Sequence, residues 1–268
     1  MRIGLQGAKV SSGSGPGFYF GLVCEGPGDE RTVQLLTRRV YEREVEWLED
    51  NFDSVIGWTG VEQGSDYTRW SGASGVKQLA KQRRIKVHGR FSGETWRGEA
   101  RQATKAIRLF MDEIRRRGDD FGLILVVLSR DTDDRGMRRQ GLRKAREESS
   151  APFEIVLAVA HPKRESWILS AMSLKDEDGQ ERLDALRKEL GFDPTLEAHK
   201  LTASTSGAKR DAKRVLDELL ASPTDSVRRK REVLQAASLS RLHKRGKDTG
   251  LAEFLGELSQ RKPDELGE

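Results

Sequence analysis

Three short runs of almost continuous apolar residues divide the chain, and each has the length of a buried strand. They are 18–24 (FYFGLVC), 121–128 (FGLILVVL) and 154–160 (EIVLAVA). Apolar runs of this length, bounded by turn-forming residues, are typical of strands that are covered on both faces. The pattern therefore predicts a largely parallel sheet. Two further short strands are predicted at 54–58 and 85–87.

Between and after these runs, apolar residues recur at helical spacing. The clearest case is 96–117, where Ala100, Ala103, Ile107 and Phe110 share one face and Lys and Arg cover the other. Strands that alternate with helices predict an α/β fold with helices flanking the sheet. Helices are also predicted at 32–52, 137–148, 164–172, 181–190, 208–220, 226–237 and 250–260.

The same pattern divides the chain into regions. Residues 1–17 are rich in Gly and Ser, which predicts a flexible N-terminal lead-in. The α/β domain is predicted to span 18–180, and a helical C-terminal region, 181–268, is expected to pack on it. Residues 54–95 mix Trp, Gly and basic residues without a clear period, so we interpret them as an insertion.

Composition excludes several classes of protein. A chain of 268 residues can bury a substantial core, and 34% of its residues are charged. No stretch approaches the 18 or more apolar residues of a membrane span, and the first residues lack the apolar segment of a secretory signal. A single cysteine excludes a disulfide framework and a cysteine-based zinc site. We expect a soluble cytoplasmic protein.

Charge is distributed unevenly along the chain. Residues 76–118 hold 13 Lys and Arg against 4 Asp and Glu, and residues 199–248 hold 13 against 6. Basic stretches of this kind suit a polyanionic partner such as nucleic acid, although ordinary solvated helix faces give the same pattern. The candidate nucleic-acid-binding residues in the first stretch are Lys77, Lys81, Arg83, Arg84, Lys86 and Arg90.

Acidic residues follow the predicted strands, at the edge where open α/β sheets bind ligands. Glu25 comes directly after the first strand, Asp131 and Asp133 follow the central one, and Glu165 lies a few residues after the third. Oxygen ligands without Cys or clustered His suit Mg²⁺ or Mn²⁺. The candidate metal ligands are Glu25, Asp131, Asp133, Asp134 and Glu165.

Structural roles explain the same acids as well. Glu25 can cap the following helix or pair with Arg31, and Asp131 and Asp133 can form a turn and a helix cap. Glu165 can be a helix-start acid that the helix dipole favours. Arg130, directly before the acidic segment, can pair with one of the carboxylates.

These segments carry a resemblance to a known family. GLVCEGPGDE (21–30) and LSRDTDDRG (128–136) resemble the two signature motifs of the TOPRIM domain. AHPKRESWILSAM (160–172) resembles a segment of small bacterial TOPRIM-like proteins related to the OLD-type nucleases. The resemblance covers roughly residues 18–172 and implies a TOPRIM-like, Rossmann-like fold.

The resemblance also implies roles for individual residues. It makes Glu25 a general base or metal-coordinating acid, and Asp131 and Asp133 metal ligands, with Glu165 a further contributor. OLD-type nucleases use an additional lysine, for which Lys209 is the candidate counterpart here, although an ordinary helix-surface lysine explains Lys209 better. The implied catalytic set is therefore Glu25, Asp131, Asp133 and Lys209.

The implied function is Mg²⁺- or Mn²⁺-dependent hydrolysis of phosphodiester bonds in DNA or RNA, in bacterial anti-phage defence with an ATPase partner. The tyrosines, Tyr19, Tyr41 and Tyr67, do not lie in a setting that marks a topoisomerase nucleophile. One alternative is a non-catalytic TOPRIM-like module that binds nucleic acid or a partner. A phosphohydrolase of haloacid-dehalogenase type fits less well, because its nucleophilic Asp directly follows the first strand.

Overall fold

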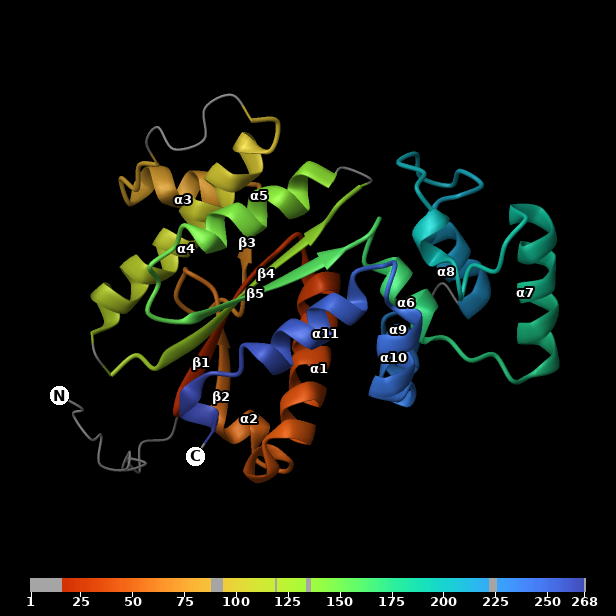
Figure 1. Cartoon of the computed structure of the whole chain (residues 1–268), viewed down its shortest axis with the longest axis horizontal. Helices are drawn as coiled ribbons and strands as arrows, with labels where there is room; N and C mark the ends of the chain where they lie inside the picture. Colours follow the sequence, from red (N-terminus) through yellow and green to blue (C-terminus); the bar gives the residue numbers. More distant parts are fainter. Residues whose placement is uncertain (1–15, 88–93, 119, 134–135, 222–225, 268) are drawn as a thin grey trace.

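The computed structural model describes residues 16–87, 94–118, 120–133, 136–221 and 226–267. These residues form an α/β fold in which helices flank a five-stranded, all-parallel sheet (Figure 1). The fold class predicted from the sequence is confirmed. All but the last two residues of the predicted lead-in, as well as Arg90 and Asp134, lie outside the described residues.

Strand β1 (Phe18–Cys24) lies at the centre of the sheet. It pairs on one edge with β4 (Leu123–Asp131), which pairs in turn with β5 (Glu154–Ala160). The other edge of β1 pairs first with β2 (Ile56–Thr59) and then, at its carboxyl end, with β3 (Thr68–Arg69). All the carboxyl ends therefore point to the same edge of the sheet.

The predicted strands agree with β1 and β5 and fall short of the end of β4. The structure extends β4 by three residues beyond the predicted end, so that Asp131 is its last residue and pairs with Ala160. Part of the predicted insertion belongs to the sheet, because 54–95 supplies β2 and β3 as well as helix α3 (Val76–Gln82). The strand predicted at 85–87 is wrong, since these residues are irregular.

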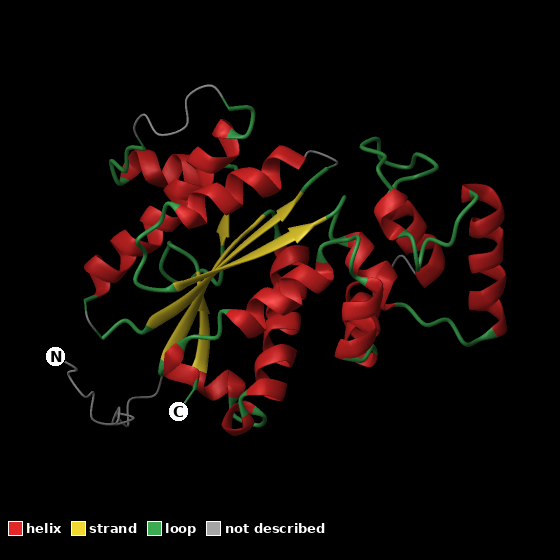
Figure 2. Cartoon of the chain, in the orientation of Figure 1, coloured by secondary structure: helices red, strands yellow, loops and turns green. Residues whose placement is uncertain are grey.

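Helices cover both faces of the sheet (Figure 2). On one face, α3, α4 (Arg97–Arg117) and α5 (Gly136–Glu147) bury residues such as Leu79, Phe110 and Leu142 against the strands. On the other face lie α1 (Pro27–Glu44), α6 (Glu165–Ala171) and α11 (Leu251–Gln260). Alternate residues of β1 face the two layers, as expected from the two-residue period of a strand.

The first of these helices differs from its prediction at both ends. Helix α1 begins at Pro27 rather than at residue 32, and its first turn is held by one half of a capping box, in which the Gly26 amide donates to Asp29 Oδ2 at 3.1 Å. It ends at Glu44, and the predicted remainder forms the 3₁₀ turn η1 (Glu46–Leu48) and the short α2 (Phe52–Val55).

The C-terminal region has two parts. Helices α7 (Glu177–Leu190) and α8 (Ala212–Leu220) form a lobe beside the sheet, with α9 (Ser226–Ala236) and α10 (Leu239–Arg245) between them and the main body (Figure 1). The chain then returns to the sheet as α11, and the 3₁₀ turns η2 (Ala198–Lys200) and η3 (Asp264–Leu266) complete the region. Helix α10 is absent from the sequence prediction.

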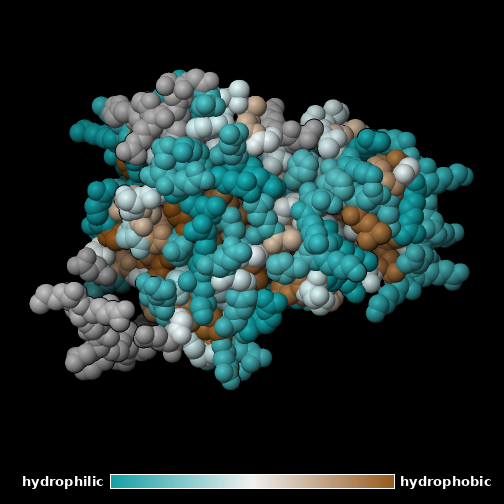
Figure 3. Space-filling model, viewed as in Figure 1, coloured by the Kyte–Doolittle hydropathy of each residue, from teal (hydrophilic) through white to brown (hydrophobic). Residues whose placement is uncertain are grey.

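The outer surface is mainly hydrophilic on the face shown in Figure 3, where hydrophobic residues gather in separate small areas. None of the helices in the described ranges combines the length and the apolar character needed to cross a membrane.

Candidate functional site

Acidic side chains gather at the carboxyl edge of the sheet. Glu25 follows β1, Asp131 ends β4, and Glu165 opens α6 just after β5. Asp29, in the first turn of α1, joins them. The topology brings them together because β1, β4 and β5 are neighbours that point the same way. The topology therefore places Glu25, Asp131 and Glu165 at the same edge of the sheet.

Asp131 is half-buried among these acids. Its Oδ1 accepts a hydrogen bond of 2.9 Å from the backbone amide of Arg164. Burial raises the pKa of Asp131 well above its usual range, and the negative charges of Asp29, Glu165 and Glu25 raise it further. The ionised form of Asp131 is thus unfavourable unless positive charge lies close to it.

Arg164 supplies positive charge to the two neighbouring acids on the α1 side. Its Nε lies 3.0 Å from Asp29 Oδ1, and one terminal nitrogen lies 3.0 Å from Glu165 Oε1. The other terminal nitrogen donates to the Gly28 carbonyl at 2.9 Å. A Cβ at position 28 would lie 2.8 Å from the guanidinium group, so the glycine lets Arg164 approach the backbone this closely. The Arg164 side chain therefore joins the start of α1 to the start of α6.

Two further arginines hold the acids nearer to α4 and α5. Arg138 contacts Asp133 Oδ2 at 2.6 Å and donates to the Asp131 carbonyl at 2.7 Å. Arg130 lies 3.4 Å from Glu25 Oε1 and 3.4 Å from Glu99 Oε2. Burial raises the pKa of Glu25, and the charges of Arg130 and Arg138 oppose that rise. We call these acids and arginines the carboxyl-edge cluster; its members are Glu25, Asp29, Glu99, Arg130, Asp131, Asp133, Arg138, Arg164 and Glu165.

The structure distinguishes among the structural roles that the sequence allows for these acids. Glu25 does not cap α1, whose capping box uses Asp29, and its ion-pair partners are Arg130 and Arg138 rather than Arg31. Arg130 does pair with a carboxylate, as its position allows. The Asp131 carboxylate accepts from the start of α6, across the sheet edge, whereas the Asp131 backbone carbonyl accepts from Arg138 of the following helix α5.

Lys209 stands apart from this cluster. It is exposed in the loop before α8, and its carbonyl accepts a hydrogen bond of 2.9 Å from Arg214. The neighbouring loop is instead tied to the cluster side by Lys163, which contacts Asp211 Oδ1 at 3.5 Å. The proposed role of Lys209 thus gains no support from its contacts.

The sequence analysis missed four members of the cluster: Asp29, Glu99, Arg138 and Arg164. Asp29 and Arg164 lie inside the segments that carry the TOPRIM resemblance. Their closeness in sequence to Glu25 and Glu165 is the feature that could have marked them as site residues. Glu99 belongs to α4, which crosses the sheet edge from the other layer. Nothing in the local sequence around Glu99 distinguishes it from a solvated helix acid.

The cluster has the donor chemistry of a magnesium site but not its arrangement. Carboxylate oxygens suit Mg²⁺ and Mn²⁺. Among the residues that the structure describes, however, no three His, Cys, Asp or Glu side chains are placed to hold one metal ion. Guanidinium groups contact Glu25, Asp133, Asp29 and Glu165 instead. A divalent ion fits only if arginines give up these contacts.

The predicted nucleic-acid-binding residues divide into two groups. Lys77, Lys81, Arg84 and Lys86 line, together with Lys105, a groove of about 1130 Å³ beside α3. Arg83 points elsewhere, because it contacts Glu113 at 2.6 Å and Asp112 at 3.2 Å and is mostly buried. Arg83 therefore has a structural role, which the sequence could not distinguish from that of its basic neighbours.

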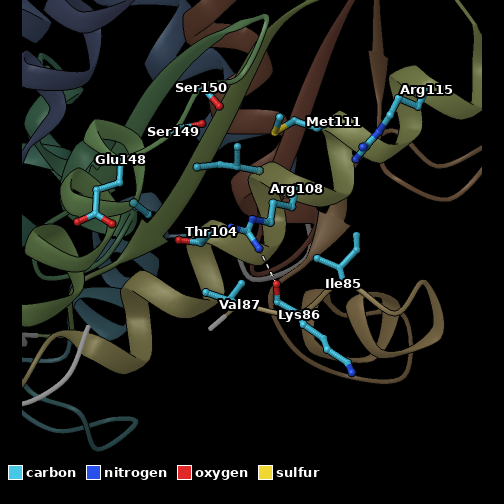
Figure 4. A pocket seen from close by; sticks show the side chains of 12 residues that line it. Ile85, Lys86, Val87, Thr104, Arg108, Met111, Arg115, Glu148, Ser149 and Ser150 are labelled. Carbon is cyan, nitrogen blue, oxygen red and sulfur yellow. Dashed lines mark hydrogen bonds between the residues drawn. The ribbon is translucent and has the colours of Figure 1, made fainter. Parts of the chain in front are cut away.

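A second cavity of about 420 Å³ adjoins this groove and shares Ile85, Lys86 and Val87 with it. Figure 4 shows Arg108 of α4 turned toward the Lys86 backbone, where it donates to the carbonyl at 2.5 Å. Glu148 lines the opposite side. No member of the carboxyl-edge cluster is among the described residues that line either space, so both are separate from it.

In comparisons with known proteins, no family model, curated protein or solved structure matches the chain.

Proposed function

We propose that this protein is a TOPRIM-type nuclease that hydrolyses phosphodiester bonds in DNA or RNA with Mg²⁺ or Mn²⁺. The observation that carries the proposal is the state of Asp131. It ends a central strand, and burial together with three neighbouring carboxylates raises its pKa. Acids held together against their mutual repulsion at a sheet edge are typical of catalytic sites.

The side chains of the cluster suit two requirements of phosphodiester hydrolysis, which are to hold divalent ions and to bind the phosphate. Bound divalent ions would activate a water molecule and stabilise the charge that develops on the leaving oxygen. Glu25, Asp131 and Asp133 supply the carboxylates that such ions require. Arg130, Arg138 and Arg164, once released from carboxylates, can donate to the non-bridging oxygens of the phosphate.

The biological setting follows from the sequence resemblance alone. OLD-type nucleases and their small relatives accompany ATPases in anti-phage defence, and we extend that setting to this chain. A cytoplasmic location and an ATPase partner are parts of the same proposal.

The decisive experiment measures cleavage of end-labelled single-stranded DNA, duplex DNA and RNA by the purified protein with Mn²⁺, with Mg²⁺ and with EDTA. We expect cleavage only with a divalent ion. Asp131→Asn should lower the rate by at least about 100-fold, because it removes a carboxylate that the divalent ions require. Asp178→Asn, an exposed substitution on α7, is the matched control. Undiminished cleavage by the Asp131 variant would contradict the proposal.

A second function is favoured by the ion pairs themselves. Arginines hold Glu25 and Asp133 in place, as they would in a non-catalytic module that binds nucleic acid or a partner protein. Such a module should bind nucleic acid equally well with EDTA or Mg²⁺, should show no cleavage, and should bind equally well after Glu25→Gln. The proposed nuclease should instead lose activity with that substitution.

A further inference from the structure

A third basic cavity lies between α1 and α9, on the face of the sheet opposite to the Lys77 groove. Its volume is about 510 Å³. Five of its lining residues are cationic, and none of the described residues that line it is acidic. The cationic residues are Arg31, Arg164, Arg228, Lys230 and Arg231. Because Arg164 also contacts Asp29 and Glu165, this cavity adjoins the carboxyl-edge cluster.

A smaller cavity of about 260 Å³ continues the first along α1. The two share Arg31, Leu35 and Arg231. At the far end of the second cavity lie Trp58 of β2 and the ion pair between Arg38 and Asp53, whose atoms are 2.6 Å apart. Together they form one surface, from Arg164 at the cluster to Trp58, that we call the α1–α9 groove.

Not all cations of this groove are equally available to a ligand. Lys230 contacts Asp217 at 3.0 Å, and Arg228 contacts Glu232 at 3.2 Å. Arg31 and Arg231 are exposed and lie at the junction of the two cavities. An anion in the groove would therefore meet these two arginines first.

The groove also contains apolar surface. Leu35 and Leu234 form part of its lining, and Val227 lies at its side with 58% of its surface exposed. Trp58 adds a partly exposed aromatic ring. A surface that alternates arginines with apolar and aromatic side chains suits unpaired bases on a phosphate backbone. Duplex DNA offers mainly its backbone to such a surface, because its bases are stacked inside.

From this continuity we infer that the α1–α9 groove binds single-stranded nucleic acid and leads the strand to the carboxyl-edge cluster. Arg31 and Arg231 contact phosphates, and Trp58 stacks on a base. The inference deepens the proposed function, on which it rests, by naming a single strand as the substrate class. It also places the substrate on the sheet face opposite to Lys77 and Lys81.

The test is a binding titration in EDTA, so that cleavage plays no part. Fluorescence anisotropy follows a labelled oligothymidylate of about 15 nucleotides, close to the upper end of single-strand site sizes. Arg31→Gln/Arg231→Gln should weaken binding by about 10-fold. It should also lower the slope of log affinity against log salt by about 1.4, since each lost single-strand phosphate contact contributes about 0.7.

The matched control, Lys175→Gln/Lys188→Gln, removes the same amount of charge from exposed positions at α7. It should change the affinity less than about twofold, because those charges are remote and screened by salt.

Lys77→Gln/Lys81→Gln tests the opposite groove. A loss confined to that variant would overturn the inference, and so would tighter binding of a duplex of equal length. Displacement of the strand by a mononucleotide at similar concentration would overturn it too.

The two proposals can fail separately. Binding that depends on Arg31 and Arg231, in a protein that never cleaves, supports the groove and contradicts the nuclease. Cleavage that depends on Asp131, with binding unaffected by Arg31→Gln/Arg231→Gln, supports the nuclease and overturns the groove.

Discussion

At the scale of single residues, the protein places like charges together and then neutralises them locally. Asp131 is held by one backbone hydrogen bond while three carboxylates raise its pKa. Burial likewise raises the pKa of Asp29, against the opposing charge of Arg164. Such an arrangement lowers stability, and it persists where function requires the charges.

The first prediction concerns the pH dependence of stability at Asp131. Its pKa is higher in the folded chain than in the unfolded one, where it is about 4. The protonated Asp131 carboxyl therefore contributes its full share to folding stability below the unfolded pKa. This contribution is lost as the pH rises through the folded pKa. Asp131→Asn keeps the acceptor for the Arg164 amide, so we expect a Tm about 2–4 °C higher at pH 8, a gain of about 1 kcal/mol.

Thermal melts followed by circular dichroism at pH 8 and at pH 4.5 measure this effect. Little difference is expected at the lower pH, because it lies close to the pKa of the carboxyl in the unfolded chain. Asp178→Asn serves as the control at both pH values. A Tm increase of the same size at both would contradict the charge explanation.

The second prediction concerns Arg164, whose side chain is 17% exposed. Arg164→Gln leaves Asp29 and Glu165 without their shared cation. It should lower the free energy of unfolding by about 2–4 kcal/mol, because the two carboxylates then remain mostly buried without a compensating positive charge. Millimolar Mg²⁺ should restore part of this loss, since the freed carboxylates then accept a divalent ion.

Urea denaturation with and without Mg²⁺ provides the measurement. Arg187→Gln is the matched control, because Arg187 also pairs with two acids but is 42% exposed and should contribute less than about 1 kcal/mol. Equal losses from the two substitutions would show that the position of Arg164 among the acids is unimportant.

At the scale of elements, the crossing of α4 and α5 decides where two members of the cluster lie. The helices approach closely at Gly141, where a Cβ would lie 2.7 Å from Glu99 Cβ and 2.8 Å from the Ala100 amide nitrogen. This contact sets Glu99 on α4 next to Arg138 on α5. The Arg138 Nε lies 3.6 Å from the Glu99 Oε1. The packing of two helices thus positions charges at the sheet edge.

The third prediction tests this crossing. Gly141→Ala should lower the free energy of unfolding by about 1–3 kcal/mol, because the added methyl group meets backbone that cannot move away easily. Gly256→Ala, in α11, meets nothing within 4 Å and should instead stabilise the protein by about 0.5–1 kcal/mol through helix propensity. Chemical denaturation of both variants gives the comparison. Opposite signs are the expected outcome, and a stabilising Gly141→Ala would contradict it.

At the scale of the whole molecule, the last helix closes the main core. Trp167 of α6 stacks on Phe254 of α11 with ring centres 5.3 Å apart. Glu257 of α11 accepts the Leu157 amide of β5 at 2.8 Å and contacts Arg146 of α5 at 2.6 Å. The C-terminal region is therefore not a simple addition to the α/β domain.

The fourth prediction follows from this closure. A chain that ends at Leu174 lacks Phe254, Leu255 and Leu258, all of which are fully buried in the full chain. The exposed face of the sheet and α6 would then lack its cover, so we expect a broad thermal transition and loss of the near-ultraviolet circular dichroism of Trp167. A sharp, cooperative melt of the shortened chain would show that residues 18–174 fold alone.

The sequence by itself determined the strands and the edge at which the acids lie. Runs such as 154–160 are recognisable because a strand buried on both faces admits almost no polar residue. The order of those runs then placed Glu25, Asp131 and Glu165 at one edge. Short elements such as β3 and α10 were missed, because they hold too few apolar residues to show a period.

Only the tertiary structure decided which charges meet. Arg164 and Asp29 are far apart in the chain and 3.0 Å apart in space, and Glu99 reaches Arg130 from another layer. Arg83 and Lys81 are near neighbours in sequence, yet one is held by Glu113 and the other lines a groove. Sequence reports the sign of each charge, whereas its energy depends on distance and burial, which the packing of remote elements sets.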